Sequence, residues 1–194
     1  INVMHKKINS LKNKKILICV TGSIAAYKTC EIIRLLRKEN VNVQVMMTKS
    51  AQKFVGKASF SALTNNKVIT DIFPDTPKAG LEHIEMAMNL DAIVVVPATA
   101  NILCKAANGI ADDIISTNLS VGEQPTLFVP AMNFRMWQNP ATMDAVEAAK
   151  AKLPKYDGDT SKVFCTQFAL SVFKRADDED RAGMADKNTA RTFY

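Results

Sequence analysis

The sequence predicts an α/β protein built on a doubly wound parallel sheet. Three observations support this fold class. Apolar segments rich in β-branched residues recur along the chain, segments with apolar residues at helical spacing lie between them, and polar turns close the apolar segments. Parallel strands need long crossover connections, and these are right-handed. Strands that alternate with helices therefore indicate a parallel sheet with helices on both faces.

The first part of the chain contains two strand–helix units. Residues 14–22 form a continuous apolar run closed by a glycine, which is typical of a strand covered on both faces. Residues 23–40 have apolar side chains at helical spacing, with Asn40 as the stop. Residues 41–48 are expected to form the second strand, and a helix is expected to begin at 49–55 after a turn rich in Ser and Thr.

The alternation continues through the middle of the chain. Residues 66–73 suit a short strand or an extended edge, and residues 83–90 suit a short helix. The strong strand at 91–97 follows directly. Residues 100–120 have a helical pattern with a break near Gly109.

The last elements set the expected domain organisation. A buried strand is predicted at 125–132, and a helix with proline at an early position at 139–153. The remainder is polar and weakly periodic, apart from an apolar island at 163–173. We expect one domain, with residues 1–153 forming the body and residues 154–194 a flap or C-terminal tail of the same domain.

Composition narrows the functional class. The 194 residues are 47% hydrophobic, enough for one sizeable core. No apolar run approaches the roughly 20 residues of a membrane span, and the first residues lack the apolar core of a signal peptide, so we expect a cytoplasmic protein without membrane partners. The net charge is +6, and the lysines are scattered along the chain, with the densest group in an N-terminal arm before the first apolar run. This distribution does not indicate nucleic-acid binding. The four cysteines show neither metal-ligand nor disulfide-scaffold spacing.

The carboxyl ends of the strands should bring four polar turns to one edge of the sheet, where such folds bind ligands. Gly22 and Ser23 precede a helix whose first amides could hold an anion, and Thr48 and Ser50 offer hydroxyls, although each could equally serve only as a helix cap. A phosphate held by hydroxyls and amides, without a phosphate-loop lysine, suits flavin mononucleotide (FMN). The small side chains and the amide of 97–101 would let a flat ring approach the backbone.

Four motifs carry a resemblance to a known family. In this order and spacing they resemble the flavin-containing cysteine decarboxylases, and in particular the phosphopantothenoylcysteine decarboxylase domain of coenzyme A biosynthesis. The motifs are VTGSIAAYK, HIEMA, PATANILCKAANGIADD and PAMNFRMWQNPAT. The resemblance covers about residues 14–152. It implies a flavodoxin-like, Rossmann-like three-layer sandwich, bound FMN, and a homotrimer or a dodecamer of trimers with the active site between subunits.

The resemblance also assigns roles to residues. The residues that it implies for FMN binding are Gly22, Ser23, Thr48, Ser50, Phe60, Thr99, Ala100 and Asn101. His83 would be catalytic, Asn133 catalytic and substrate-binding, and Met132 and Met136 would lie beside the substrate. Cys165 would be the proton donor of the flap. The sequence around Cys165 departs from the family's Cys-Gly and Gly-Arg-Met pattern, so a buried apolar role for Cys165 stays equally open.

These roles suit the chemistry of cysteine decarboxylation. Transfer of a hydride from the thiol-bearing carbon to the flavin gives a thioaldehyde, which accepts the electrons released as CO2 departs. Imidazole can take the thiol proton near neutral pH. We expect FMN-dependent decarboxylation of 4'-phosphopantothenoylcysteine to 4'-phosphopantetheine. A peptidyl-cysteine decarboxylase of lantibiotic maturation and a non-catalytic flavoprotein regulatory subunit are the alternatives.

Overall fold

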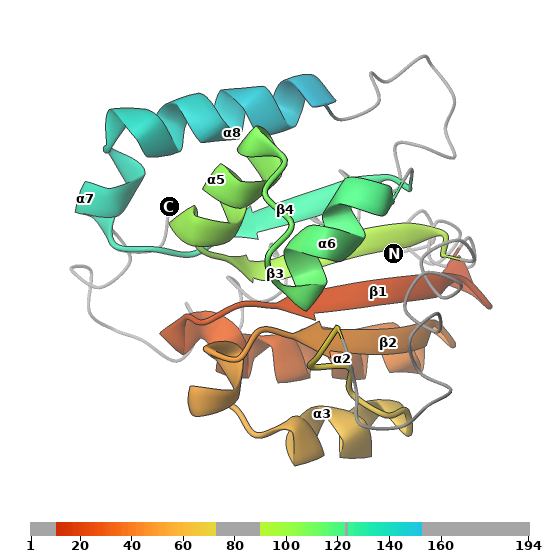
Figure 1. Cartoon of the computed structure of the whole chain (residues 1–194). Coiled ribbons are helices and arrows are strands. Elements are labelled where there is room, and N and C mark those ends of the chain that lie inside the picture. The colour runs from red at the N-terminus through yellow and green to blue at the C-terminus, as the bar shows by residue number, and fades with distance from the viewer. Residues whose placement is uncertain (1–10, 73–89, 123, 153–194) are drawn as a thin grey trace, which may run out of the picture.

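The computed structural model describes residues 11–72, 90–122 and 124–152, and these form a three-layer α/β arrangement around a parallel sheet (Figure 1). The described strands are β1 (Lys15–Val20), β2 (Asn42–Met47), β3 (Ala92–Ala98) and β4 (Thr126–Pro130), in the order β2-β1-β3-β4. All three pairings are parallel. The chain leaves β1 for one neighbour and later returns to place β3 on its other side. This is the switch point at which doubly wound sheets bind ligands.

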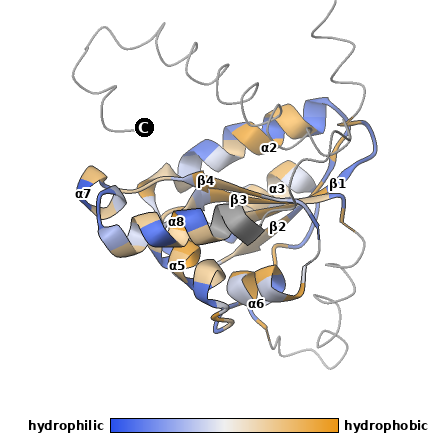
Figure 2. Cartoon of the chain, turned by 90° about the horizontal axis from the view of Figure 1, so that it is seen from above, coloured by the Kyte–Doolittle hydropathy of each residue, from blue (hydrophilic) through white to orange (hydrophobic). Residues whose placement is uncertain are grey.

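Helices cover both faces of the sheet (Figures 1 and 2). One face packs against α2 (Lys28–Lys38) and α3 (Lys57–Thr64), while α5 (Ala100–Asn108), α6 (Ile114–Val121) and α8 (Pro140–Lys152) lie on the other side. Three short helical turns, η2 (Ile24–Tyr27), η3 (Ala51–Lys53) and α7 (Phe134–Trp137), follow strands directly.

The alternation of side chains along the strands explains this layering. Ile16 and Ile18 of β1 pack with the α2 side chains, whereas Leu17 and Cys19, one residue out of phase, pack with residues of α5 and α6. Successive strand side chains point to opposite faces, so a strand buried on both sides has to be apolar at every position. The continuous apolar runs of the sequence are therefore the cause of the two-sided covering.

The strands predicted at 14–22, 41–48, 91–97 and 125–132 are confirmed as β1 to β4, and two helix predictions need correction. The helix expected at 23–40 begins with the separate 3-10 turn η2, and Asn40 follows its end in a left-handed conformation. The helix expected from residue 49 is only the short turn η3, because the chain is extended at Gly56 before α3 begins. The predicted break at Gly109 is confirmed by its φ of 69°.

Three other parts of the chain differ from the predicted elements or lie outside the described residues. Within 66–73, Ile69 forms an isolated parallel bridge to Met46 rather than a strand. The four-residue helix α7 was not predicted. The predicted helix at 83–90 and the expected flap at 154–194 lie outside the described residues, apart from residue 90. None of the described helices is long and apolar enough to cross a membrane.

Candidate functional site at the carboxyl edge of the sheet

The turns that follow the four strands lie along one edge of the sheet, on the left in Figure 1. We call residues 21–23, 48–50, 99–101 and 131–139 the edge turns; they follow β1, β2, β3 and β4 respectively. Neighbouring strands are about 4.8 Å apart, so the row from the β2 turn to the β4 turn spans about 14 Å. The edge thus has the dimensions of a site for an extended ligand.

Gly22 and Ser50 bring the first two edge turns into contact. A Cβ atom at Gly22 would lie 2.5 Å from Ser50 Oγ and 2.6 Å from Ser50 Cβ, distances that real side chains do not tolerate. Ser50 Oγ is also 3.0 Å from Thr48 Oγ1, which accepts a hydrogen bond from the Ala51 amide. Glycine is therefore required here, and two hydroxyls gather against its backbone.

Ser23 is the N-cap of η2. Its Oγ accepts a hydrogen bond of 3.3 Å from the Ala25 amide, and the side chain is partly exposed. Capping uses the oxygen as an acceptor and leaves the hydroxyl proton available for an anion. The capping interpretation and the ligand-binding interpretation of Ser23 are compatible.

The third edge turn presents the start of α5. Thr99 is its N-cap without a side-chain cap bond, and the first intrahelical bond runs from the Leu103 amide to the Thr99 carbonyl. The amides of 100–102 therefore have no intrahelical acceptor and lie at the positive end of the helix dipole. Asn101 is exposed, whereas the Ala100 side chain is buried, so Ala100 could meet a ligand only through its backbone.

Thr21 ties the first edge turn to the third and was not identified from the sequence. Its buried hydroxyl donates a 2.6 Å hydrogen bond to the Pro97 carbonyl and accepts one of 3.2 Å from the Thr99 amide. Thr29 of α2 similarly donates to the Val96 carbonyl at 3.0 Å. Both threonines satisfy carbonyls that lie beyond the β1–β3 ladder, which ends at Val95.

Asn133 begins α7 after β4. Its Oδ1 accepts a hydrogen bond of 2.9 Å from the Arg135 amide, and the side chain is exposed. Because Oδ1 is used in this capping hydrogen bond, Nδ2 is the side-chain atom that can donate to solvent or to a ligand. The two predicted methionines differ in their surroundings: Met132 packs against the core beneath the edge, whereas Met136 is exposed.

Phe60 is not brought to this edge. Its side chain is fully buried in the core between α3 and the sheet, so it offers no surface to a ligand in this chain. Phe54, directly after η3, is the aromatic residue beside the second edge turn, and about half of its surface is exposed. Both residues lie in the segment after β2, and helical phase alone could not show which one was exposed. His83 and Cys165 lie outside the described residues.

Asp112 and Asp113 hold the start of α6 and are not part of the edge. Asp113 is the N-cap of α6, and its carboxylate accepts hydrogen bonds from the amides of Ile115 and Ser116 at the positive end of the helix. Lys105 Nζ lies 2.6 Å from Asp112 Oδ1 and 2.7 Å from Asp113 Oδ2. The hydrogen bond from Lys105 lowers the pKa of Asp112. Burial favours the neutral amine of Lys105, but its hydrogen bonds to both carboxylates raise its pKa overall.

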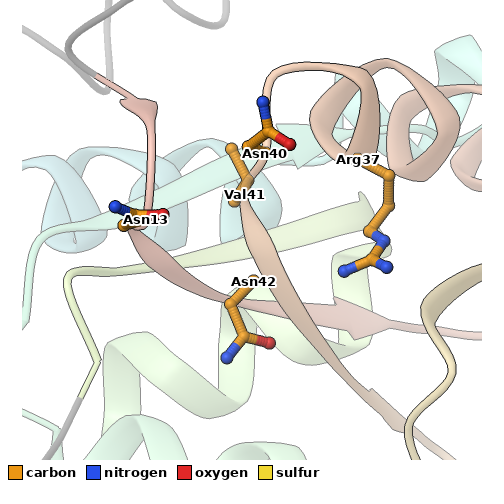
Figure 3. Close-up of a pocket in the computed structure, with 5 residues that line it drawn as sticks. All are labelled: Asn13, Arg37, Asn40, Val41 and Asn42. Atoms are coloured by element: carbon orange, nitrogen blue, oxygen red, sulfur yellow. The ribbon is translucent and has the colours of Figure 1, made fainter.

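The edge turns carry positive charge and no carboxylate. Their charged residues are Lys49 and Arg135, both exposed. A separate hollow of about 400 Å³ lies at the opposite, amino-terminal edge, lined by Asn13, Arg37, Asn40, Val41 and Asn42 (Figure 3). It contains none of the candidate binding or catalytic residues predicted from the sequence. No cluster of possible metal ligands occurs in the part of the chain that the structure describes.

Comparisons with known proteins agree with this geometry. The family described as Flavoprotein matches residues 4–188. The chain is 41% identical over 150 residues to the coenzyme A biosynthesis bifunctional protein CoaBC of Mycobacterium tuberculosis, covering 77% of this chain and 34% of that protein. It is 44% identical over 131 residues to CoaBC of Bacillus subtilis, covering 68% and 32%. The chain thus spans about a third of the length of these relatives.

The solved structures that resemble this chain include several decarboxylases. The FMN-dependent cysteine decarboxylase SpaF has a TM-score of 0.69 and 29% identity, covering 78% of this chain and 95% of that one. TvaF, a cysteine decarboxylase of thioviridamide biosynthesis, has the same score and identity, covering 81% and 98%. A PPC decarboxylase variant bound to pantothenoylaminoethenethiol has a TM-score of 0.61 and 26% identity, covering 72% and 79%.

Proposed function

Because this chain belongs to the flavoprotein family, we propose that it binds FMN and decarboxylates 4'-phosphopantothenoylcysteine to 4'-phosphopantetheine, a step of coenzyme A biosynthesis. Membership of the flavoprotein family supports a flavin cofactor, and the similarity to an FMN-dependent decarboxylase supports FMN as that flavin. We also propose that it acts in the cytoplasm as a homotrimer or a dodecamer of trimers.

The observation that carries the proposal is the order of the edge turns. The hydroxyls of Thr48 and Ser50 and the backbone of Gly22 lie at the β2–β1 side, and Asn133 lies beyond β4 at the other end. The amino end of α5 lies between them, after β3. We call Gly22, Thr48 and Ser50 the phosphate cradle. Along the edge, the cradle is followed by the amino end of α5, which would face the flat ring, and then by Asn133, whose amide would donate to a carboxylate.

The residues present fit FMN. Because Gly22 has no side chain, Ser50 can lie directly against its backbone, and this brings a hydroxyl of the second edge turn to the first, where hydroxyls and backbone together could hold an anion. Ser23, Thr48 and Ser50 would hold the phosphate. Thr99, the Ala100 backbone and Asn101 would face the ring, and Phe54, which directly follows η3 and is half exposed, would take the place of the buried Phe60 as the aromatic residue beside the flavin.

When bound, the flavin supplies a hydride acceptor for oxidation of the thiol-bearing carbon. We propose that His83 removes the thiol proton, because an imidazole with a pKa of about 6.5 is available as a base near neutral pH. The Nδ2 of Asn133 would donate to the substrate carboxylate while its Oδ1 stays in the α7 cap. Met132 and Met136 would line the substrate position, and Cys165 would return a proton to the product.

A second function has its own support. The peptidyl-cysteine decarboxylase EpiD matches the chain with a TM-score of 0.62 and 31% identity, about as well as the PPC decarboxylase variant, so a peptidyl-cysteine decarboxylase is the second candidate. The higher sequence identity to the CoaBC proteins favours the small substrate. A non-catalytic regulatory flavoprotein would bind flavin without turnover.

The test is to purify the FMN-loaded protein and to weigh the products from 4'-phosphopantothenoylcysteine and from a peptide ending in cysteine. Loss of CO2 alone from the first substrate is expected. Loss of CO2 and two hydrogens from the peptide would indicate the second function, and unchanged substrates in both assays would leave the regulatory alternative. His83→Asn should keep the yellow colour and lose the product; a fully active variant would exclude His83 as the base.

A further inference from the structure

We propose that Lys49 pairs with the phosphate of the bound flavin and so makes the site selective for FMN over riboflavin. The inference rests on the proposed flavin site and deepens it, since it assigns a cation to a cradle otherwise built from hydroxyls and amides. Neither the phosphate-loop pattern nor the family resemblance pointed to this residue.

The position of Lys49 is fixed by the turn after β2. The Thr48 amide donates to the Val20 carbonyl of β1, and the Ala51 amide donates to the Thr48 carbonyl at 3.1 Å, which closes a turn with Lys49 and Ser50 at its two central positions. The turn is held again by the bond from the Ala51 amide to Thr48 Oγ1. The backbone of Lys49 therefore lies between the two residues, Thr48 and Ser50, that supply the hydroxyls of the cradle.

Lys49 is the cation of the edge turns that lies on the cradle side. It is exposed and takes part in none of the ion pairs found among the described residues. Arg135, the other charged residue of the edge turns, follows β4, about 14 Å along the sheet from the β2 turn. No carboxylate in the edge turns competes for the ammonium group.

A phosphate monoester carries about 1.5 to 2 negative charges at neutral pH, and a hydrogen bond in which both partners are charged is stronger than a neutral one. A hydroxyl cradle alone would bind this charge through neutral donors. Riboflavin presents the same ring without the phosphate. The effect of a Lys49 substitution on FMN affinity, compared with its effect on riboflavin affinity, therefore isolates the contribution of the ammonium group.

The experiment is a fluorescence titration of apoprotein with FMN and with riboflavin. For Lys49→Gln, the Kd for FMN should rise about three- to tenfold, which allows for the exposure of the pair, while the Kd for riboflavin stays within about twofold. Lys49→Arg keeps the charge and should retain most of the FMN affinity. Lys38→Gln, an exposed lysine at the end of α2, is the matched control and should change neither Kd.

Salt provides a second readout. The FMN affinity of the wild-type protein should fall with increasing salt more steeply than that of Lys49→Gln, because screening weakens only the charged pair. Equal losses for FMN and riboflavin would show that Lys49 supports the turn rather than the phosphate, and unchanged FMN affinity would also overturn the inference. Failure of the wild-type protein to bind either flavin would instead overturn the proposed function together with it.

Discussion

The hydroxyl of Thr21 donates a 2.6 Å hydrogen bond to the carbonyl oxygen of Pro97 and thereby joins the ends of β1 and β3. The same hydroxyl accepts from the Thr99 amide, which precedes α5. One buried side chain thus aligns the turn that would hold the flavin phosphate with the turn that would face its ring.

Thr21→Val should destabilise the protein and loosen the flavin site. The valine keeps the shape but leaves the Pro97 carbonyl without this donor, so the free energy of unfolding should fall by about 1–3 kcal/mol. Urea unfolding followed by circular dichroism measures this change, and flavin fluorescence measures the affinity. Thr117→Val, whose hydroxyl makes an exposed bond to the Ala111 carbonyl, is the control. Equal stability of the two variants would contradict the role of Thr21.

Gly22→Ala should disrupt the cradle. The new methyl group would lie 2.6 Å from Ser50 Cβ, and relief of such overpacking typically costs about 1–3 kcal/mol. Thermal unfolding and FMN titration should both register the loss, and adding Ser50→Gly should recover part of the stability. Gly56→Ala, where no atom lies within 4 Å of the added Cβ, should remain within about 0.5 kcal/mol of wild type. If both alanine variants bind FMN normally, the contact is unimportant.

Asn133→Asp should separate the cap of α7 from substrate binding. Aspartate is as good an N-cap as asparagine, so stability should hardly change. It replaces the Nδ2 donor by a negative oxygen, which would repel the substrate carboxylate, and kcat/KM should fall about a hundredfold or more. Asn133→Ala should lose both the cap and the activity. Steady-state product formation and melting curves distinguish the two effects, and an active aspartate variant would refute the assigned donor.

The ion pairs of Lys105 should make the free energy of unfolding decrease as the pH falls into the acid range. The bond to Lys105 lowers the pKa of Asp112 in the folded state, so the stabilisation is present above the unfolded pKa of about 3.9 and is lost as the pH falls through the lower folded value. Asp112→Asn should therefore be less stable than wild type at pH 7, with the difference shrinking in acid. Urea unfolding across this range is the measurement. Asp144→Asn, on the exposed face of α8, is the control, and a difference independent of pH would refute the explanation.

The strands and the edge could be predicted from sequence because continuous β-branched runs and alternating helices leave few other arrangements. Ser23 was also recognisable as a possible cap residue from its position between a strand and a helix. The helical pattern of 23–40 could not reveal the 3-10 turn η2, because the two helix types have similar spacing over one turn.

The misplaced and missed residues depend on tertiary contacts. Phe60 and Phe54 are six positions apart, and only the packing of α3 shows which one is buried. Thr21 and Thr29 serve carbonyls of β3 that lie some 70 residues further along the chain. Nothing local in the sequence marks such bonds.

The most direct test of the account is the number of CO2 molecules released per bound flavin from 4'-phosphopantothenoylcysteine without oxygen or any other electron acceptor. The proposed decarboxylation returns the hydride to the product, so many molecules of CO2 should be released per flavin while the flavin ends oxidised and 4'-phosphopantetheine accumulates. Release of a single CO2 per flavin, with the flavin left reduced, would contradict the account and identify an oxidative decarboxylase.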